Sequence, residues 1–224
     1  MAQALTETRN ADNARSYGDD LTDVWLGRNT PGETISLPRN LDELVKFAET
    51  HLPLGWLGED GVPIEVSNDE QEFYGLQGSQ LILTKNTKTT KSMKVQCLEE
   101  VARVTELFWD HGKPKAVGPG ESLVDLPASM RTIDVWCIAR FVHGSYYKIY
   151  VFPNALIGER GTVEHNNSAL TIHELNVKVR GRGWMITNNP DYFNQSEGKD
   201  HFPGEAKGLA VAEVEGVDVS DLQA

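Results

Sequence analysis

The fold is decided by residues 66–112, which read VSNDEQEFYGLQGSQLILTKNTKTTKSMKVQCLEEVARVTELFWDHG. Residues 66–84 and 89–97 both have the composition of extended segments, with threonine, β-branched and aromatic side chains. The tetrapeptide between them, Lys85–Lys88, is polar and contains few good helix formers. We therefore predict a long β-hairpin whose turn is formed by Lys85–Lys88.

The last part of this stretch, residues 98–112, has the spacing of an amphipathic helix. Its apolar face is formed at i, i+3, i+7 and i+10 by Leu98, Val101, Thr105 and Phe108. Glu99 and Glu100 would lie in the first turn, at the positive end of the helix dipole, and Gly112 is placed for a left-handed stop. We predict one helix directly after the hairpin, a combination that favours assembly over catalysis.

Composition indicates a folded, acidic protein. The chain has 224 residues, 39% of them apolar, with five Trp, seven Phe and six Tyr, which is enough for one sizeable core. The formal net charge of −12 argues against a protein that binds free nucleic acid, because that affinity comes from Lys and Arg facing phosphates. No run approaches the ~18 apolar residues of a membrane span, so we expect no membrane contact.

The other segments predict a mainly β fold, a β-sandwich or partly closed barrel, with eight to ten strands and one minor helix at Asp42–Thr50. Pro153 is expected to break a strand, and residues 113–129 to form a loop without secondary structure. The clearest remaining strands are Val24–Gly27, Ile133–Phe141, Tyr146–Phe152, Leu170–Arg180 and Trp184–Thr187.

We expect the chain to consist of one β domain between two terminal arms. Residues 1–20 are polar without a period and predict a flexible arm, and they lack the apolar segment of a signal peptide. Residues 21–195 would form the β domain, and the acidic residues 196–224 a second arm. We expect the protein to stay in the cytoplasm or in an assembly made there.

Residues that could carry catalysis or bind a cofactor do not fall into recognisable patterns. The six histidines show no metal-binding spacing, and Gly181-Arg182-Gly183 lacks the third glycine of a dinucleotide loop. Cys97 and Cys137 are expected to be half-buried small hydrophobic residues rather than a disulfide or a zinc site. We predict no enzymatic activity, no metal and no cofactor.

Several short motifs in a fixed order resemble one protein family. They are VWLG at 24–27 with Leu37-Pro38, LGWLGEDGV at 54–62, FYGLQG at 73–78, and the threonine-rich strand with its Leu-Glu at 84–100. Over residues 22–190 this order resembles the major tail tube protein of long, non-contractile (siphovirus-type) phage tails, in particular those of actinobacteriophages. The chain departs from the family at Leu76, because the family commonly has Trp before Gln.

The resemblance implies a structural virion protein. Such a subunit is similar to a β-sandwich that donates a long hairpin, braced by one helix, to an inter-subunit barrel; six copies form a ring, and stacked rings form the tube that conducts DNA from capsid to host. The implied partners are other copies of the chain, a tape-measure protein inside the tube, terminator and distal tail proteins at its ends, and DNA that passes without specific binding. Assembly would take place in the host cytoplasm, and residues 1–20, 113–129 and 203–224 would connect rings.

Within the hairpin, the resemblance assigns to inter-subunit contacts Phe73, Gln77, Leu81, Leu83, Lys85, Lys88, Lys91, Met93 and Val95. Carboxylates facing the channel would repel DNA phosphates, which makes the lysines of the hairpin unexpected there. Our hypothesis is that Lys85, Lys88, Lys91 and Lys94 point outward or meet acids of the adjacent ring. The candidate acidic partners are Asp69, Glu70 and Glu72. The alternative is that the lysines are solvated residues of an unassembled hairpin.

Two other classes of protein stay open. A related phage ring protein, such as a tail terminator, a distal tail protein or a head decoration protein, would not polymerise without limit. A carbohydrate-binding module or hydrolase would need exposed aromatic residues beside carboxylates. The candidates for that surface are Trp136, Tyr146, Tyr147 and Tyr150, although their strand pattern is more typical of a core.

Overall fold

A computed structural model describes residues 14–74, 76, 79–190 and 192 of the chain. The chain divides into two compact units, residues 1–187 and 188–224, and each is described by itself. In the second unit, the described residues include a turn in which the Tyr192 amide donates to the Asn189 carbonyl oxygen at 3.1 Å. All other elements belong to the first unit.

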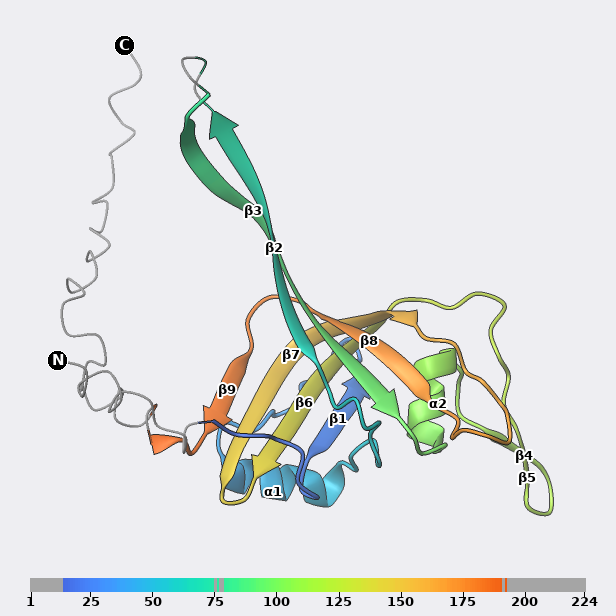
Figure 1. Cartoon of the computed structure of the whole chain (residues 1–224). Coiled ribbons are helices and arrows are strands. Elements are labelled where there is room, and N and C mark those ends of the chain that lie inside the picture. Colours follow the sequence, from blue (N-terminus) through green and yellow to red (C-terminus); the bar gives the residue numbers. More distant parts are fainter. Residues whose placement is uncertain (1–13, 75, 77–78, 191, 193–224) are drawn as a thin grey trace, which may run out of the picture. The chain divides into compact units, whose positions relative to one another are not determined.

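The described chain is mainly β, which confirms the predicted fold class, and its large antiparallel sheet is sandwich-like and does not close into a barrel. Neither described helix is long and apolar enough to cross a membrane. The strands are β1 (Asp23–Arg28), β2 (Ile64–Tyr74), β3 (Leu81–Cys97), β4 (Lys115–Gly118), β5 (Glu121–Leu123), β6 (Ile133–His143), β7 (Tyr146–Arg160), β8 (His173–Val179) and β9 (Trp184–Thr187). The helices are α1 (Leu41–Thr50) and α2 (Ala102–Trp109). The sheet order is β1-β6-β7-β8-β3-β2, with β9 paired to β7 (Figure 1).

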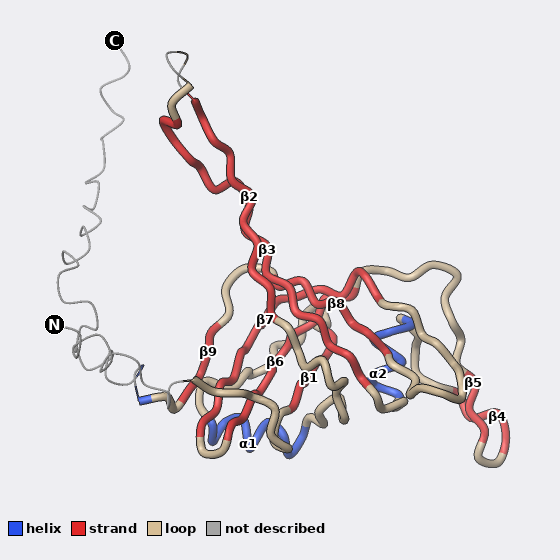
Figure 2. Tube along the Cα trace, viewed as in Figure 1, coloured by secondary structure: helices blue, strands red, loops and turns tan. Residues whose placement is uncertain are grey.

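Strand β7 joins the two halves of the sheet, and the predicted break at Pro153 is wrong. The first half of β7 pairs with β9 and the second half with β8, while β6 runs along its other edge (Figure 2). Pro153 lies where the register with β6 shifts, between the pairs Cys137↔Phe152 and Val135↔Ala155. A bulge tolerates proline because the missing amide is not needed for a ladder bond, so the strand bends and continues.

Apolar side chains on both faces of the sheet build two core clusters. The first lies against α2 and contains, among others, Val24, Val95, Val135, Phe108 and Leu175. The second lies against α1 and contains Trp25, Leu44, Phe47, Trp136, Ile138, Ile149 and Val151. Strand β6 is buried on both faces, which explains its nearly continuous apolar sequence.

Helix α1 begins one residue before the predicted boundary and is held by a cap that sequence inspection missed. The Asn40 side chain accepts a 2.8 Å hydrogen bond from the Glu43 amide, and the Glu43 carboxylate accepts another from the Arg39 amide. This reciprocal pattern satisfies two amides that have no partner inside the helix. Leu44 and Phe47 then face the second core cluster.

Helix α2 is shorter than predicted at both ends. Glu99 lies outside the helix, because its carboxylate accepts a 2.8 Å hydrogen bond from the Trp56 amide and so holds the preceding segment extended. The left-handed residue that ends α2 is Asp110 (φ 53°) and not Gly112. Helix α2 packs against the sheet as predicted, since Val104, Leu107 and Phe108 share a core cluster with Met93, Val95 and Cys97 of β3. The predicted apolar face is wrong except for Phe108, because Leu98 precedes the helix, Val101 is its N-cap and Thr105 is only half-buried.

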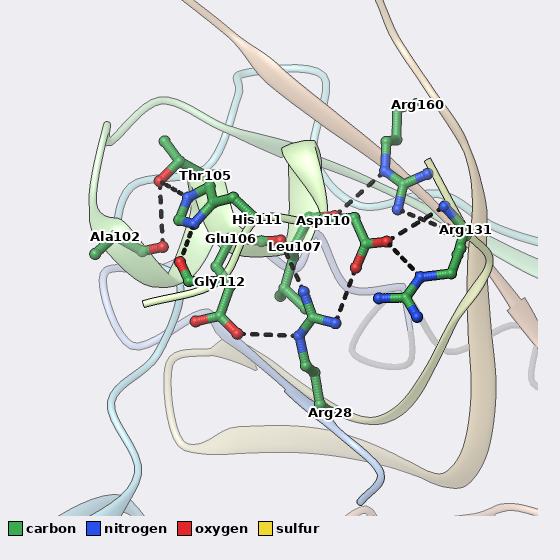
Figure 3. Close-up of polar contacts among 10 residues, drawn as sticks. All are labelled: Arg28, Ala102, Thr105, Glu106, Leu107, Asp110, His111, Gly112, Arg131 and Arg160. Carbon is green, nitrogen blue, oxygen red and sulfur yellow. Dashed lines mark hydrogen bonds and ion pairs between the residues drawn. The ribbon is translucent and has the colours of Figure 1, made fainter. Parts of the chain in front are cut away.

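Arginines from distant strands complete the end of α2. The helix has no basic residue in its last turn, but Arg28 of β1 donates to the Glu106 carbonyl oxygen at 3.1 Å and Arg160 of β7 donates to the Leu107 carbonyl oxygen at 3.3 Å. Arg28 also pairs with the Asp110 carboxylate at 3.0 Å (Figure 3). An eight-residue helix is marginal alone, so these contacts with the C-terminal carbonyl groups fix it to the sheet.

The Asp110 carboxylate predicts a pH-dependent stability. Burial opposes its ionisation, but hydrogen bonds from Arg28 and Arg131 outweigh burial and hold the pKa below its usual value. A group whose pKa is lowered by folding stabilises the fold above its unfolded pKa of about 3.9, and this stabilisation is lost as pH falls through the folded pKa. We expect Asp110→Ala to lower the free energy of unfolding by about 2–3 kcal/mol at pH 7.

Asp110→Asn is the matched control, since Asn tolerates the left-handed conformation and keeps one acceptor oxygen. Its loss of unfolding free energy relative to the wild type should be smaller than that of Asp110→Ala. This loss should also be smaller at about pH 3 than at pH 7, because the wild type itself loses the stabilisation once the pH falls below the unfolded carboxyl pKa of about 3.9. Urea unfolding of the monomer at both pH values measures this. A deficit of the Asn variant that is unchanged at low pH would contradict the role given to the carboxylate charge.

The predicted hairpin turn and the predicted 113–129 loop both need correction. Lys85–Lys88 lies inside β3, and the turn falls between Tyr74 and Leu81, because the acidic strand β2 pairs with the lysine-bearing strand β3. Residues 113–129 contain the small hairpin β4–β5, with Gly120 at φ 78° in its turn. Strand β8 begins at His173, three residues after the predicted start of this strand at Leu170.

The segment before β1 contacts the β6–β7 turn. The Gly18 amide donates to the Val142 carbonyl oxygen at 3.1 Å, and the His143 ring donates to the Ser16 carbonyl oxygen at 2.6 Å. Residues 1–13 and 196–224 of the predicted arms lie outside the described residues. The predicted domain boundaries therefore stay predictions.

Candidate assembly surface on the β2–β3 hairpin

The outer part of the β2–β3 hairpin leaves the sheet (Figures 1 and 2). Strand β2 pairs with β3 from Ile64↔Met93 to Tyr74↔Leu81, but β8 covers β3 only from Lys91 to Cys97. Beyond that point, no other strand among the described residues pairs with either edge. At about 3.4 Å per residue, the free part from Val66 to Tyr74 is about 30 Å long.

Cross-strand contacts hold the free hairpin in register. Asp69 lies opposite Lys88, and their charged groups are 4.0 Å apart. The Thr87 hydroxyl donates to the Asp69 carbonyl oxygen at 2.9 Å, where the register shifts by one residue. Such a bulge increases the local twist of the two strands. The hairpin therefore has a defined geometry without support from the sheet.

The two free edges have opposite charge. Strand β2 carries Glu65, Asp69, Glu70 and Glu72 and no basic residue. Strand β3 carries Lys85, Lys88, Lys91 and Lys94 and no acidic residue; Lys85 and Lys88 lie on the free part, and Lys91 and Lys94 lie where β8 pairs with β3. Every described residue from 65 to 89 is exposed, so these charges lie in water in the isolated subunit.

Large apolar side chains are exposed at the outer end of the hairpin. Phe73 lies opposite Leu83 and Tyr74 opposite Leu81, and Ile82 is 72% exposed. Adjacent apolar side chains left in water usually mark a contact with another molecule. The candidate assembly surface therefore consists of the two free edges and this apolar outer end of the hairpin.

The structure divides the predicted assembly residues into two groups. The exposed members on the free hairpin are Phe73, Leu81, Leu83, Lys85 and Lys88, together with Asp69, Glu70 and Glu72. Lys91 is also exposed, but it lies at the base of the hairpin, where β3 pairs with Val179 of β8. Met93 and Val95 are 1% and 0% exposed and belong to the core of this chain. Lys94 pairs with Glu174 of the same chain at 2.7 Å. Gln77 lies outside the described residues.

Other parts of the described chain give weaker evidence for a functional site. Trp136, the central aromatic residue of the carbohydrate-binding alternative, is 5% exposed and packs edge-on against Phe47, so it belongs to the core. Cys97 and Cys137 are both free and are fully buried, which is deeper than the half-buried positions predicted for them. Burial raises the pKa of the Cys97 thiol to about 12. A cleft of about 470 Å³ beside Trp56 and Asp19 is open to solvent.

Comparison with known proteins gives distant structural similarity. No protein-family model and no curated protein matches the chain. A chain from the tail of an empty gene transfer agent particle with C6 symmetry is 11% identical, with a TM-score of 0.40, over 75% of this chain and 98% of its own. A chain from the native gene transfer agent virion is 12% identical, with a TM-score of 0.37, over 73% and 95%.

A chain from the six-fold symmetrised baseplate of the anti-feeding prophage is 10% identical, with a TM-score of 0.37, over 73% of this chain and 91% of its own. The similar chains thus come from a tail, a virion and a baseplate. At these identities and TM-scores, the similarity by itself assigns no function to the chain.

Proposed function

We propose that the chain is the subunit of a phage-type tail tube, a structural virion protein without enzymatic activity. Six copies would form a ring in which the β2–β3 hairpins pair edge to edge, and rings would stack into a tube that conducts DNA from the capsid to the host. The partners would be other copies of the chain, a tape-measure protein during assembly, and terminator and distal tail proteins at the ends. The tail would assemble in the host cytoplasm, as in siphovirus-type phages.

The observation that carries this proposal is the free hairpin with two unpaired edges. Each edge presents backbone amide and carbonyl groups that can pair with another strand, and soluble proteins normally protect or shorten such edges. Here the strands extend well beyond β8, and their outer end is apolar. Pairing of hairpins from several copies into one barrel would satisfy all of these edges, because a closed barrel has none.

Charge supports the same role. The chain has a formal net charge of −12, so a tube built from many copies would repel the phosphates of passing DNA. The free hairpin contributes little to this charge, since its lysines and carboxylates balance. The sequence motifs that resemble the tail tube family extend over both the body and the hairpin.

Negative-stain electron microscopy of the purified full-length chain at increasing concentration tests the proposal. We expect hollow tubes of sixfold symmetry whose length increases with concentration, since contacts between stacked rings do not close on themselves. Single rings that never stack would contradict a tube subunit and favour a terminator, distal tail or decoration protein. A monomer that binds a sugar or converts a substrate would contradict any structural role.

A further inference from the structure

The separation of charge between the two strands is more than the hairpin itself requires. A hairpin is stabilised when opposite charges face each other across its strands, and acids and bases on either strand achieve this equally well. Only one ion pair between β2 and β3 occurs among the described residues, Lys88 with Asp69, at 4.0 Å. In the described chain, Glu65, Glu70, Lys85 and Lys91 take part in no ion pair. Their charges remain available to another molecule.

Two copies can pair their free edges in three ways. Strand β2 can meet β2 of the second copy, β3 can meet β3, or β2 can meet β3. Residues directly opposite on paired strands lie about 4.5–5.5 Å apart, and like charges at that distance are destabilising. The first two arrangements bring acids against acids or lysines against lysines. The third brings the carboxylates of β2 against the lysines of β3.

We infer that opposite charge on the two edges directs subunit association, so that the acidic β2 edge of one copy pairs with the basic β3 edge of the next copy. Pairing of unlike edges is heterologous, so each subunit keeps one free edge for a further subunit and the chain of contacts can close into a ring. Pairing through only one kind of like edge, β2 with β2 or β3 with β3, would end at a two-fold dimer. The inference rests on the proposed function only in requiring that hairpins of separate copies pair with each other.

Three full-length variants test the inference without changing the core. The acidic variant carries Lys85→Glu, Lys88→Glu and Lys91→Glu, and the basic variant carries Asp69→Lys, Glu70→Lys and Glu72→Lys. The swapped variant carries all six substitutions. Lys94 is kept because it pairs with Glu174 of the same chain. All six positions are exposed, and unchanged thermal unfolding of each variant serves as the folding control.

Sedimentation velocity gives the first readout. Alone, the acidic and the basic variants should need at least about a tenfold higher concentration than the wild type to associate. Their equimolar mixture should associate like the wild type, with the two variants alternating, and the swapped variant should do so alone. At about 1 M salt, where the Debye length is about 3 Å, the defect of each single variant should largely disappear.

A mixture of swapped and wild-type chains separates unlike-edge from like-edge pairing. Unlike-edge pairing would place acids against acids between the two proteins, so each should assemble with itself, and an affinity tag on one should not retain the other. Mixed assemblies would instead show that like edges pair and would overturn the inference. Normal association of the acidic variant alone, or a monomeric mixture of the acidic and basic variants, would overturn it as well.

These outcomes are distinct from failure of the proposed function. Short oligomers or single rings of the wild type, in place of tubes, would contradict the tube assignment. The acidic and basic mixture would still report whether unlike edges pair, because its readout is association and not tube length.

Discussion

A chain in which residues 68–89 are replaced by an Asn-Gly turn is expected to stay monomeric while the body of its domain remains folded. Ser67 and Thr90 face each other in the hairpin, so a two-residue turn can join them without changing the register. All described residues that are removed are exposed, whereas Met93, Val95 and the whole β3–β8 ladder are kept. The shortened chain loses both free edges and the apolar outer end, and with them the proposed subunit contacts.

The expected effect is a rise of at least about 100-fold in the concentration needed for association, equivalent to about 3 kcal/mol. Sedimentation velocity and electron microscopy measure the loss of assembly, and thermal unfolding shows that the body is intact. A control with Asn86→Ala, an exposed change on the same strand, should assemble normally. Tubes formed by the shortened chain would show that the hairpin is not the assembly element.

The largest loss of stability from a single side chain is expected for Trp136→Ala, at about 3–5 kcal/mol. Trp136 is 5% exposed, packs edge-on against Phe47 with ring centroids 5.3 Å apart, and joins α1 to the sheet. Its cross-strand partner is Gly27 of β1, and a Cβ added at Gly27 would overlap the indole ring. The glycine therefore provides the space in which the tryptophan lies.

This arrangement predicts strong coupling between the two positions. Gly27→Ala should cost about 1–3 kcal/mol in the wild type through overpacking, but much less in the Trp136→Ala background, where the ring is absent. Denaturant unfolding of the four proteins in the cycle gives the coupling energy. Combining Gly27→Ala with Leu175→Ala, in the other core cluster and three strands away, should be additive within about 0.5 kcal/mol. Additive costs for Gly27 and Trp136 would contradict the packing described.

Local patterns were sufficient where an element is decided by its own side chains. The apolar runs of β1, β6, β9 and the first half of β7 predicted those strands, and the spacing of Leu44 and Phe47 predicted α1. In these elements, periodicity and burial select the same structure. That a hairpin and then a helix occur was also predicted from residues 66–112 alone, but the position of the turn and the buried face of the helix were not.

The failures arise where contacts distant in sequence decide the structure. Glu99 looks like a first-turn residue, but it binds the Trp56 amide, which lies 43 positions earlier. Pro153 looks like a strand end until the register with β6 places it in a bulge. The tetrapeptide Lys85–Lys88 looks like a turn until its pairing with β2 places Lys85 opposite Gln71 and Lys88 opposite Asp69, inside the hairpin. Which edges of the hairpin stay free depends on the extent of β8, which no local pattern specifies.

The burial of both cysteines makes the chain well suited to site-specific chemical labelling. The sequence contains only Cys97 and Cys137, both are 0% exposed, and burial raises the pKa of each thiol. Maleimide and disulfide reagents react with the thiolate form of an accessible cysteine, so neither native residue should be modified in the folded chain at pH 7. A cysteine introduced on either edge of the hairpin would then be the single reactive thiol of the subunit. One fluorophore or spin label per copy could follow the contacts of each edge as subunits associate.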